Sequence, residues 1–268
     1  MTKRIILFAS HGLQALDVTG PSSVFSTANK FMADEKPYRV ELVSPAGGLI
    51  KTISGVSLDT ASIAETSPKG IDTILVTGHD TDGHEALVAH DAAKEWVTDA
   101  AQGARRWGSV CVGALALASW GLLSKRTVTT HWAAAEELAR MLPNTSINPD
   151  SLYVVDDDLW TSAGVTAGID MSLAMVEADL GSDIAAQIAR SLVVYLRRPG
   201  SQSQFSGPLK AQYASASSYR ELIEWAEANL DADLSVETLA ARAGHSTRTF
   251  QRHFADQIGR TPAAYIED

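Results

Sequence analysis

One cysteine occurs in the 268 residues, and its neighbours are typical of a reactive turn. Cys111 follows a small-residue pair and Val110, and it precedes Gly113 and an Ala/Leu-rich helical stretch. Small residues around a cysteine permit a sharp strand–turn–helix junction like a nucleophile elbow. The N–H groups and the dipole of the following helix favour a thiolate and could bind an oxyanion. The same pattern also fits a cysteine that is only a small buried side chain.

Length, composition and charge limit the class of protein. The 268 residues predict about two domains, and a hydrophobic content of 45% can fill a sizeable core. No apolar run approaches the ~18 residues of a membrane span, so we expect no membrane association. A single cysteine excludes an internal disulfide and favours a reducing, cytoplasmic location, and we expect neither a metal nor another cofactor. The net charge of −10 argues against coating nucleic acid, but not against one small DNA-reading element.

Strands and helices alternate over residues 1–198, which predicts a doubly wound, flavodoxin-like α/β domain with a parallel sheet. Apolar runs predict buried strands at 4–9 and 73–77, and further strands are expected at 38–44 and 109–111. Antiparallel hairpins are expected around Gly47–Gly55 and at 152–161. The predicted helices span 21–32, 85–102, 131–141, 169–180 and 183–196, with Ser182 as the cap of the last one.

The composition changes after this domain. Residues 199–217 are rich in Ser, Gln, Gly and Pro and lack periodicity, so they predict a linker that could still pack on the first domain. Residues 218–268 predict a small all-α helix-turn-helix domain. Ser218 is expected to cap its first helix, and Ser235 and Ser246 to cap the next two. The apolar face of the first helix is predicted to consist of Leu222, Ile223, Ala226 and Leu230.

The third helix of this module carries polar side chains that suit DNA. Arg can donate two hydrogen bonds to guanine and Gln can pair with adenine, while Ser246 could bind a phosphate. The alternative is an ordinary solvated helix face. Residues 218–268 hold five Arg against nine Asp and Glu, so few phosphates would be neutralised and the affinity would be modest. The outward stripe is predicted to contain Thr247, Arg248, Gln251 and Arg252, opposite Phe250, Phe254 and Ile258.

Residues 234–266, LSVETLAARAGHSTRTFQRHFADQIGRTPAAYI, resemble the AraC/XylS helix-turn-helix signature nearly position by position. The first domain resembles the ThiJ/PfpI, class I glutamine amidotransferase-like family. Together they resemble the amidotransferase-like subfamily of AraC regulators over almost the whole chain. The matching segments of the first domain are ALDVTGP (15–21), SVCVGALALASWGLL (109–123), TTHW (129–132), TSAGVTAGID (161–170) and RRPGSQSQFS (197–206).

This resemblance implies a cytoplasmic transcriptional regulator, usually an activator. It implies a DNA operator and a small amino-acid or amine-like effector as partners, and a homodimer as the assembly. DNA-binding units of the AraC family usually hold two helix-turn-helix motifs joined by a long helix. The sequence ends where that helix would start, so we expect either that it is incomplete or that the second motif is lacking. Tight specific binding then requires dimerisation or the missing motif.

The resemblance also implies a site around Cys111. In enzymes of the superfamily the elbow cysteine lies beside an acidic residue and often near a histidine, and Asp17 and His131 match these positions. The carboxyl could act as a general acid or base, and the imidazole could polarise the thiol. Backbone N–H groups of Gly78 and Val112 could form an oxyanion site. The predicted effector pocket, or vestigial catalytic site, comprises Asp17, Gly78, His79, Cys111, Val112 and His131.

Structural roles are the alternatives for these residues. Asp17 could cap a helix that begins near Pro21, and His131 could serve the start of another helix. Val112 differs from the Thr or Ala common after this cysteine, and it lacks the hydroxyl that hydratase-like relatives use. We therefore predict a ligand-responsive regulator rather than an enzyme. The competing hypotheses are a cysteine-dependent enzyme (isonitrile hydratase, glyoxalase or amidase type) and a protein-interaction module formed by the acidic helices.

Overall fold

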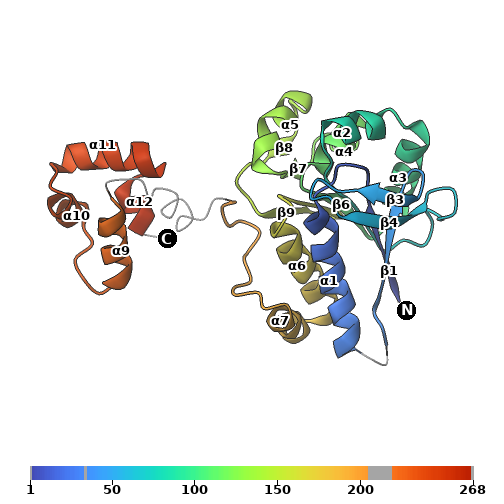
Figure 1. Cartoon of the computed structure of the whole chain (residues 1–268), viewed down its shortest axis with the longest axis horizontal. Coiled ribbons are helices and arrows are strands. Elements are labelled where there is room, and N and C mark those ends of the chain that lie inside the picture. The colour runs from blue at the N-terminus through green and yellow to red at the C-terminus, as the bar shows by residue number, and fades with distance from the viewer. Residues whose placement is uncertain (1, 33–34, 205–218, 267–268) are drawn as a thin grey trace. The chain divides into compact units, whose positions relative to one another are not determined.

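Figure 1 shows the computed structural model of the chain, which describes residues 2–32, 35–204 and 219–266. The chain divides into two compact units, the first of which ends at Gln204. The linker predicted at 199–217 lies outside the described residues from 205 onward, and so does the predicted cap Ser218. Within the described ranges, no helix is both long enough and apolar enough to cross a membrane.

Eight strands of the described residues form one sheet in the first unit. They are β1 (Lys3–Phe8), β2 (Tyr38–Ser44), β3 (Gly48–Lys51), β4 (Ser57–Ser62), β5 (Thr73–Val76), β6 (Arg106–Val110), β9 (Tyr153–Asp156) and β10 (Leu159–Ser162). Their order is β3-β4-β2-β1-β5-β6-β10-β9, and the pairs from β4 to β10 are all parallel. The outer pairs β3–β4 and β9–β10 are antiparallel, as predicted for both hairpins. A separate parallel pair joins β7 (Thr127–Val128) to β8 (Ser146–Ile147).

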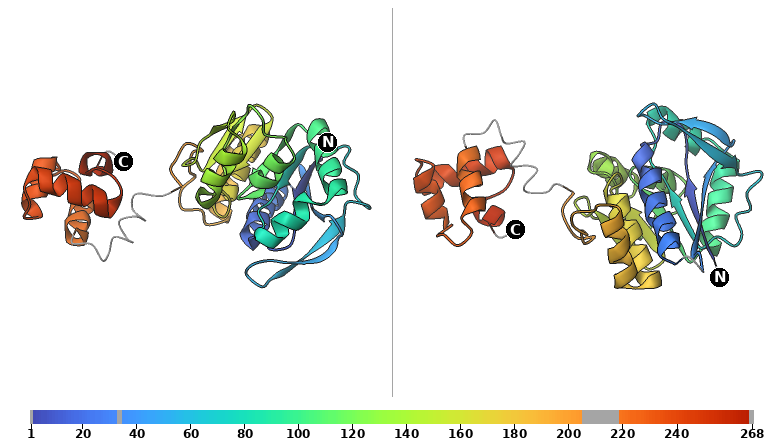
Figure 2. Two further views of the ribbon diagram at one scale, coloured as in Figure 1. Left: turned by 90° about the horizontal axis from the view of Figure 1, so that it is seen from above. Right: turned by 60° about the horizontal axis from the view of Figure 1, so that its bottom comes forward.

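Helices cover both faces of this sheet, which confirms the predicted flavodoxin-like architecture (Figures 1 and 2). One face carries α1 (Ala15–Phe31), α6 (Ala167–Leu180) and α7 (Ser182–Ser191). The other face carries α2 (Thr81–Val88), α3 (Asp91–Gly103) and α4 (Gly113–Ser119). A 3-10 turn, η1 (Trp132–Ala134), leads into α5 (Ala135–Met141), which packs against α4.

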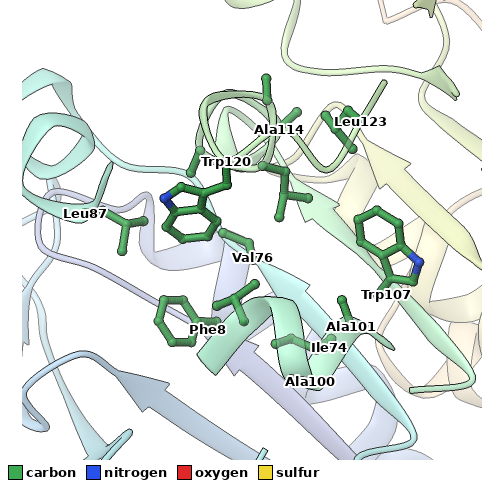
Figure 3. Close-up of a cluster of buried hydrophobic side chains, with 14 of the residues drawn as sticks. Phe8, Ile74, Val76, Leu87, Ala100, Ala101, Trp107, Ala114, Trp120 and Leu123 are labelled. Carbon is green, nitrogen blue, oxygen red and sulfur yellow. The ribbon is translucent and has the colours of Figure 1, made fainter. Parts of the chain in front are cut away.

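Strand β1 shows why the central strands need a continuous apolar run. Ile6 and Phe8 belong to the core cluster under α2–α4, whereas Ile5 and Leu7 belong to the cluster under α1, α6 and α7. Successive side chains of a strand point to opposite faces, and both faces are covered here, so the buried part of β1 from Ile5 to Phe8 is apolar at every position, while Lys3 and Arg4 lie at its partly exposed start. Figure 3 shows residues of the first of these clusters, among them Phe8, Val76 and Trp120.

The helix predicted over residues 85–102 is wrong, because the structure has two helices there. α2 ends at Val88, and α3 begins at Asp91. Between them His90 is the N-cap of α3, and its Nδ1 accepts a hydrogen bond from the Ala93 N–H at 3.2 Å. A local side-chain cap therefore restarts the helix at a point where the apolar periodicity continues unchanged.

Other helix boundaries also differ from the prediction. α1 begins at Ala15, so Pro21, expected as its first turn, lies inside it. α7 ends at Ser191 instead of 196, because Val193 takes a left-handed φ of 56° that does not continue an α-helix. Ser182, the predicted cap of α7, is its first helical residue, and the N-cap is Gly181. In each case the first or last residue of the helix depends on local backbone geometry, which the apolar periodicity of the sequence does not predict.

The second unit contains α9 (Arg220–Ala228), α10 (Val236–Arg242), α11 (Thr247–Ile258) and α12 (Pro262–Ile266). Ser235 and Ser246 accept from the Thr238 and Thr249 N–H groups at 3.3 Å, which confirms both predicted caps. The apolar face predicted for α11 is also confirmed, because its two phenylalanines and Ile258 are buried. Leu230 was expected on the apolar face of α9. It is 76% exposed, because α9 ends at Ala228.

The junction of β6 and β10 gives a stability test. Gly108 pairs with Trp160, and a Cβ at this position would lie 1.7 Å from the Trp160 carbonyl oxygen. We expect Gly108→Ala to lower the free energy of unfolding by about 3 kcal/mol, because the strands must separate to admit the methyl group. Urea denaturation measures the change. Gly103→Ala is the control, since nothing lies within 4 Å of its Cβ, and its effect should stay within about 0.5 kcal/mol. Equal effects would contradict this account of the packing.

Candidate functional site

Cys111 lies in the turn between β6 and α4, and its backbone takes a left-handed φ of 60°. Its N–H donates to the Ser162 carbonyl at 3.0 Å, and its carbonyl accepts from the Thr130 hydroxyl at 2.9 Å. A non-glycine residue in this region costs about 1–3 kcal/mol and persists only where the surrounding structure holds it. The predicted sharp turn is therefore present, and neighbouring loops fix it from both sides.

Two glycines let these loops approach Cys111. Gly164 follows β10 with a φ of 81°, and a Cβ there would lie 2.2 Å from the Cβ of Cys111. Gly78 follows β5, and a Cβ there would lie 3.0 Å from Asp17 Oδ2 and 3.1 Å from the Cβ of Cys111. The loops after three neighbouring strands thus meet at the thiol, and a larger side chain at either glycine would separate them.

Asp17 lies in the first turn of α1 and is fully buried. Its Oδ1 accepts from the Val165 N–H at 2.7 Å, so the carboxyl joins α1 to the loop after β10. Its buried Oδ2 has no hydrogen bond of normal geometry to any described residue, although the Cys111 thiol and the Gly78 amide lie close. The alternative in which Asp17 caps a helix beginning near Pro21 is wrong, because both residues lie inside α1.

Burial controls the protonation of the carboxyl and the thiol. It raises the pKa of Asp17 to about 6, against the lowering effects of the Val165 amide, the Cys111 thiol and the Gly78 amide. Burial and the Asp17 charge also raise the pKa of the Cys111 thiol, and the Val112 N–H lowers it less. Double ionisation would place two negative charges in one buried site, so the pair keeps a proton at neutral pH. The dipole of the following helix favours a thiolate at Cys111, but burial and the Asp17 charge favour the protonated thiol.

The two predicted histidines are held by other contacts. His131 is the N-cap of η1, where its Nδ1 accepts from the Ala133 N–H at 3.3 Å, and partial burial lowers its pKa. Among the described residues no hydrogen bond joins its ring to Cys111. His79 is buried with its Nε2 3.5 Å from the Nδ1 of His84. Burial first, and then the charge of His84, lower the pKa of His79 to about 4, so its ring is neutral.

Of the six residues predicted for the pocket, the structure brings together Asp17, Gly78, Cys111 and Val112. A metal does not fit this group, because no cluster of three or more His, Cys, Asp or Glu able to hold an ion occurs within the described ranges. Carboxyl, thiol and amide groups without a metal can hold a polar group of a small ligand, or act as an acid and a nucleophile.

Sequence reasoning missed the contacts that connect this site to residues 197–204. Gln204 Nε2 donates to the Thr130 carbonyl at 2.9 Å, and its Oε1 accepts from the Trp132 N–H at 2.9 Å. Arg198 binds the buried carboxylate of Asp170. The first residues of the predicted linker therefore pack on the first unit. Both pairs lie in the segments TTHW, TSAGVTAGID and RRPGSQSQFS that carry the family resemblance, and this shared resemblance could have suggested them.

In the second unit, α10, a short turn and α11 form the helix-turn-helix. Arg248, Gln251 and Arg252 are exposed on α11, and Ser246 is exposed at its start. Thr247 is half-buried, so it takes less part in the outward stripe than predicted. The Arg252 guanidinium lies 3.3 Å from Nε2 of His253. The exposed face thus offers two guanidinium groups and one amide within two helical turns.

Comparisons with known proteins cover both units. A profile of the DJ-1/PfpI family matches residues 3–178. The HTH-type transcriptional regulator CdhR of Pseudomonas aeruginosa is 28% identical over 239 residues, which are 89% of this chain and 69% of that protein. The isonitrile hydratase of Pseudomonas putida is 31% identical over 188 residues, 70% of this chain and 76% of the enzyme. The crystal structure of an AraC family transcriptional regulator from Pseudomonas putida shares the fold, with a TM-score of 0.61 and 22% identity over 71% of this chain and 99% of that one.

The raised pKa of Asp17 predicts a pH-dependent loss of stability. Between about pH 4 and pH 6 the folded state keeps a proton that the unfolded state has released, so stability falls as the pH rises through this range. A shift from 3.8 to about 6 corresponds to about 3 kcal/mol. We expect Asp17→Asn to remove this dependence, because an amide does not titrate in this range, while its oxygen can still accept from the Val165 N–H and keep the loop in place.

The measurement is the difference in unfolding free energy between the original chain and the variant, by urea denaturation from pH 4 to pH 8. His79 acts in the opposite direction, because its lowered pKa costs stability as the pH falls below about 6. Both proteins contain His79, so the difference cancels its effect. A difference that stays constant with pH would show that the carboxyl titrates normally.

Proposed function

The chain belongs to the DJ-1/PfpI family, and on this basis we propose that it is a metabolite-responsive, sequence-specific DNA-binding transcriptional regulator. The observation that carries the proposal is that one chain combines the family domain with a helix-turn-helix whose exposed face holds Arg248, Gln251 and Arg252. The match to the regulator CdhR extends over 89% of the chain and so includes both parts.

The chemistry of α11 supports direct reading of DNA. A helix of 12 residues is ~18 Å long and fits the major groove, where guanidinium groups can donate to guanine and an amide can pair with adenine. The first amides of α11 are the groups we expect to contact a phosphate, because the Ser246 hydroxyl is already bonded to Thr249 as the cap of this helix. One such motif covers a single stretch of groove, so we expect a homodimer that binds two half-sites.

The proposed sensor is the first unit, with the effector near Cys111, Gly78 and Val112. The path from this site to the second unit would begin at Cys111, whose carbonyl accepts from Thr130, and continue through Gln204 at the end of the first unit. A ligand that moves the turn would thereby move the segment that leads to the helix-turn-helix. An amino-acid or amine-like effector and a cytoplasmic location stay predictions from the family resemblance.

The DNA-binding face gives a direct test. We expect Arg248→Ala and Arg252→Ala each to weaken binding to the selected operator by about 10- to 100-fold, because each removes one bidentate contact with a base. The operator is first obtained by selection of the full chain on random duplexes. Fluorescence anisotropy on the selected duplex then gives the dissociation constants at one fixed salt concentration.

Gln257→Ala is the matched control, since this side chain is also exposed on α11 but lies outside the predicted stripe. Its affinity for the operator should stay within about twofold of the original. Circular dichroism and the melting temperature show whether each variant is folded. If folded Arg248→Ala and Arg252→Ala proteins bind the operator like the control, α11 does not read the bases.

Catalysis at Cys111 is the second candidate function. It is favoured by the contact of thiol and carboxyl at a strained turn, and by the likeness to an isonitrile hydratase. Against it stand the raised pKa of the thiol and the valine at position 112, which offers no hydroxyl.

A turnover assay separates this candidate from the first. The purified chain and its Cys111→Ala variant are incubated with a simple alkyl isonitrile, and loss of the isonitrile is followed by NMR. As a regulator, the original chain should consume it no faster than the variant. Turnover that disappears in Cys111→Ala, but persists in Ser109→Ala, would establish an enzyme.

A further inference from the structure

A cavity of about 150 Å³ opens beside the sheet, and none of the residues predicted for the effector pocket lines it. It lies between the loop after β1, the loop after β2 and helix α2, and its lining is largely apolar. No residue of the Cys111 site lines it. The residues that carry the argument are Ser10, His11, Gly47, Gly83, Leu87 and His90.

The topology of the sheet places this cavity at a switch point. β1 and β5 are neighbours, but the chain leaves β1 toward β2 on one side and leaves β5 toward β6 on the other. Ser10 follows β1, and Gly83 lies in α2, which follows β5. The two connections therefore diverge here and leave a crevice beyond the carboxyl ends of the strands, where open α/β sheets bind ligands.

Ser10 provides an independent sign of a ligand. Ser10 lines the cavity, and only 8% of the residue is exposed. Its Oγ has no hydrogen-bond partner among the described residues. A buried hydroxyl without a partner costs about 1–3 kcal/mol, and a ligand oxygen in the cavity would remove that cost.

Two histidines that line the cavity, His11 and His90, add hydrogen-bond donors, because a backbone contact fixes which ring nitrogen carries the proton. His11 Nδ1 accepts from the Lys51 N–H at 3.3 Å, and His90 Nδ1 accepts from the Ala93 N–H at 3.2 Å. A ring nitrogen that accepts carries no proton, so in each ring the proton is on Nε2. Two serines and two histidines thus line the cavity, and no Asp, Glu, Lys or Arg does. The Ser44 hydroxyl is already bonded to the Thr60 hydroxyl and the Gly47 N–H, so Ser10 is the serine whose hydroxyl has no described partner.

We propose that this cavity binds an uncharged molecule about the size of one aromatic ring that carries a carbonyl or hydroxyl oxygen. The size follows from the volume, since an apolar cavity of about 150 Å³ holds benzene. We infer an uncharged ligand because no charged side chain lines the cavity. An ammonium or a carboxylate would lose its bound water there without gaining a partner of opposite charge. The oxygen is matched to the donors of Ser10, His11 and His90. The inference goes beyond the proposed function and does not depend on DNA binding.

The test uses benzamide as the neutral probe, with benzoate and benzylamine as charged probes of nearly the same shape. Isothermal titration of the full chain at pH 7.5 gives the three dissociation constants, and ¹H–¹⁵N NMR locates the site. We expect benzamide to bind at least about tenfold more tightly than either charged probe. The amide signals of residues 44–50 and 83–90 should shift. No binding of benzamide, equal binding of a charged probe, or shifts confined to other residues would overturn the proposal.

Ser10→Ala tests the hydroxyl. We expect it to weaken benzamide binding by about 3- to 10-fold, the effect of one hydrogen bond, without lowering the melting temperature, because Oγ has no partner within the described protein. Ser109→Ala is the matched control, since its buried hydroxyl is likewise unpartnered among the described residues and does not line this cavity. It should leave benzamide binding unchanged. A Ser10→Ala chain that binds benzamide like the control would overturn the role of the hydroxyl, and the NMR map tests the cavity independently.

Discussion

The left-handed backbone of Cys111 is the constraint on which the first unit depends. Holding it requires the loops after β5, β6 and β10 to meet within van der Waals distance, which Gly78 and Gly164 permit. The same convergence buries Asp17 against Val165 and raises the pKa of the carboxyl. It also fixes Thr130 on the Cys111 carbonyl, and through Thr130 it fixes Gln204. The strained backbone of Cys111, the burial of Asp17 and the position of Gln204 at the end of the first unit thus all depend on this one turn.

The sequence predicted the fold well where burial decides the structure. The strands β1 and β5 contain buried apolar runs, which predicted them, and the predicted strand at Tyr38–Ser44 has the observed bounds although it contains Arg39 and Glu41. Helix ends were predicted less well, because single local contacts decide them. His90 starts a new helix through its own imidazole, and Val193 ends α7 through a left-handed φ. Neither effect alters the apolar periodicity from which helices are predicted.

The site was predicted in part. Matching motifs identified Cys111 and Asp17, and the comparisons confirm the family to which these motifs belong. The partner of Asp17 could not be predicted, because Val165 is 148 residues away and contributes only a backbone N–H, which every non-proline residue has. His131 was predicted near the thiol from its spacing, but its ring caps the adjacent turn. The cavity at Ser10 gave no sequence signal, because a crevice at a topological switch point exists only in the folded sheet.

The central claim is that the chain recognises a defined DNA sequence. Selection of the full chain on a random pool of duplex DNA, followed by sequencing over successive rounds, tests it most directly. The account predicts that one motif becomes enriched, and that a protein carrying both Arg248→Ala and Arg252→Ala enriches none. A folded, original chain that leaves the pool at its starting composition would contradict the account.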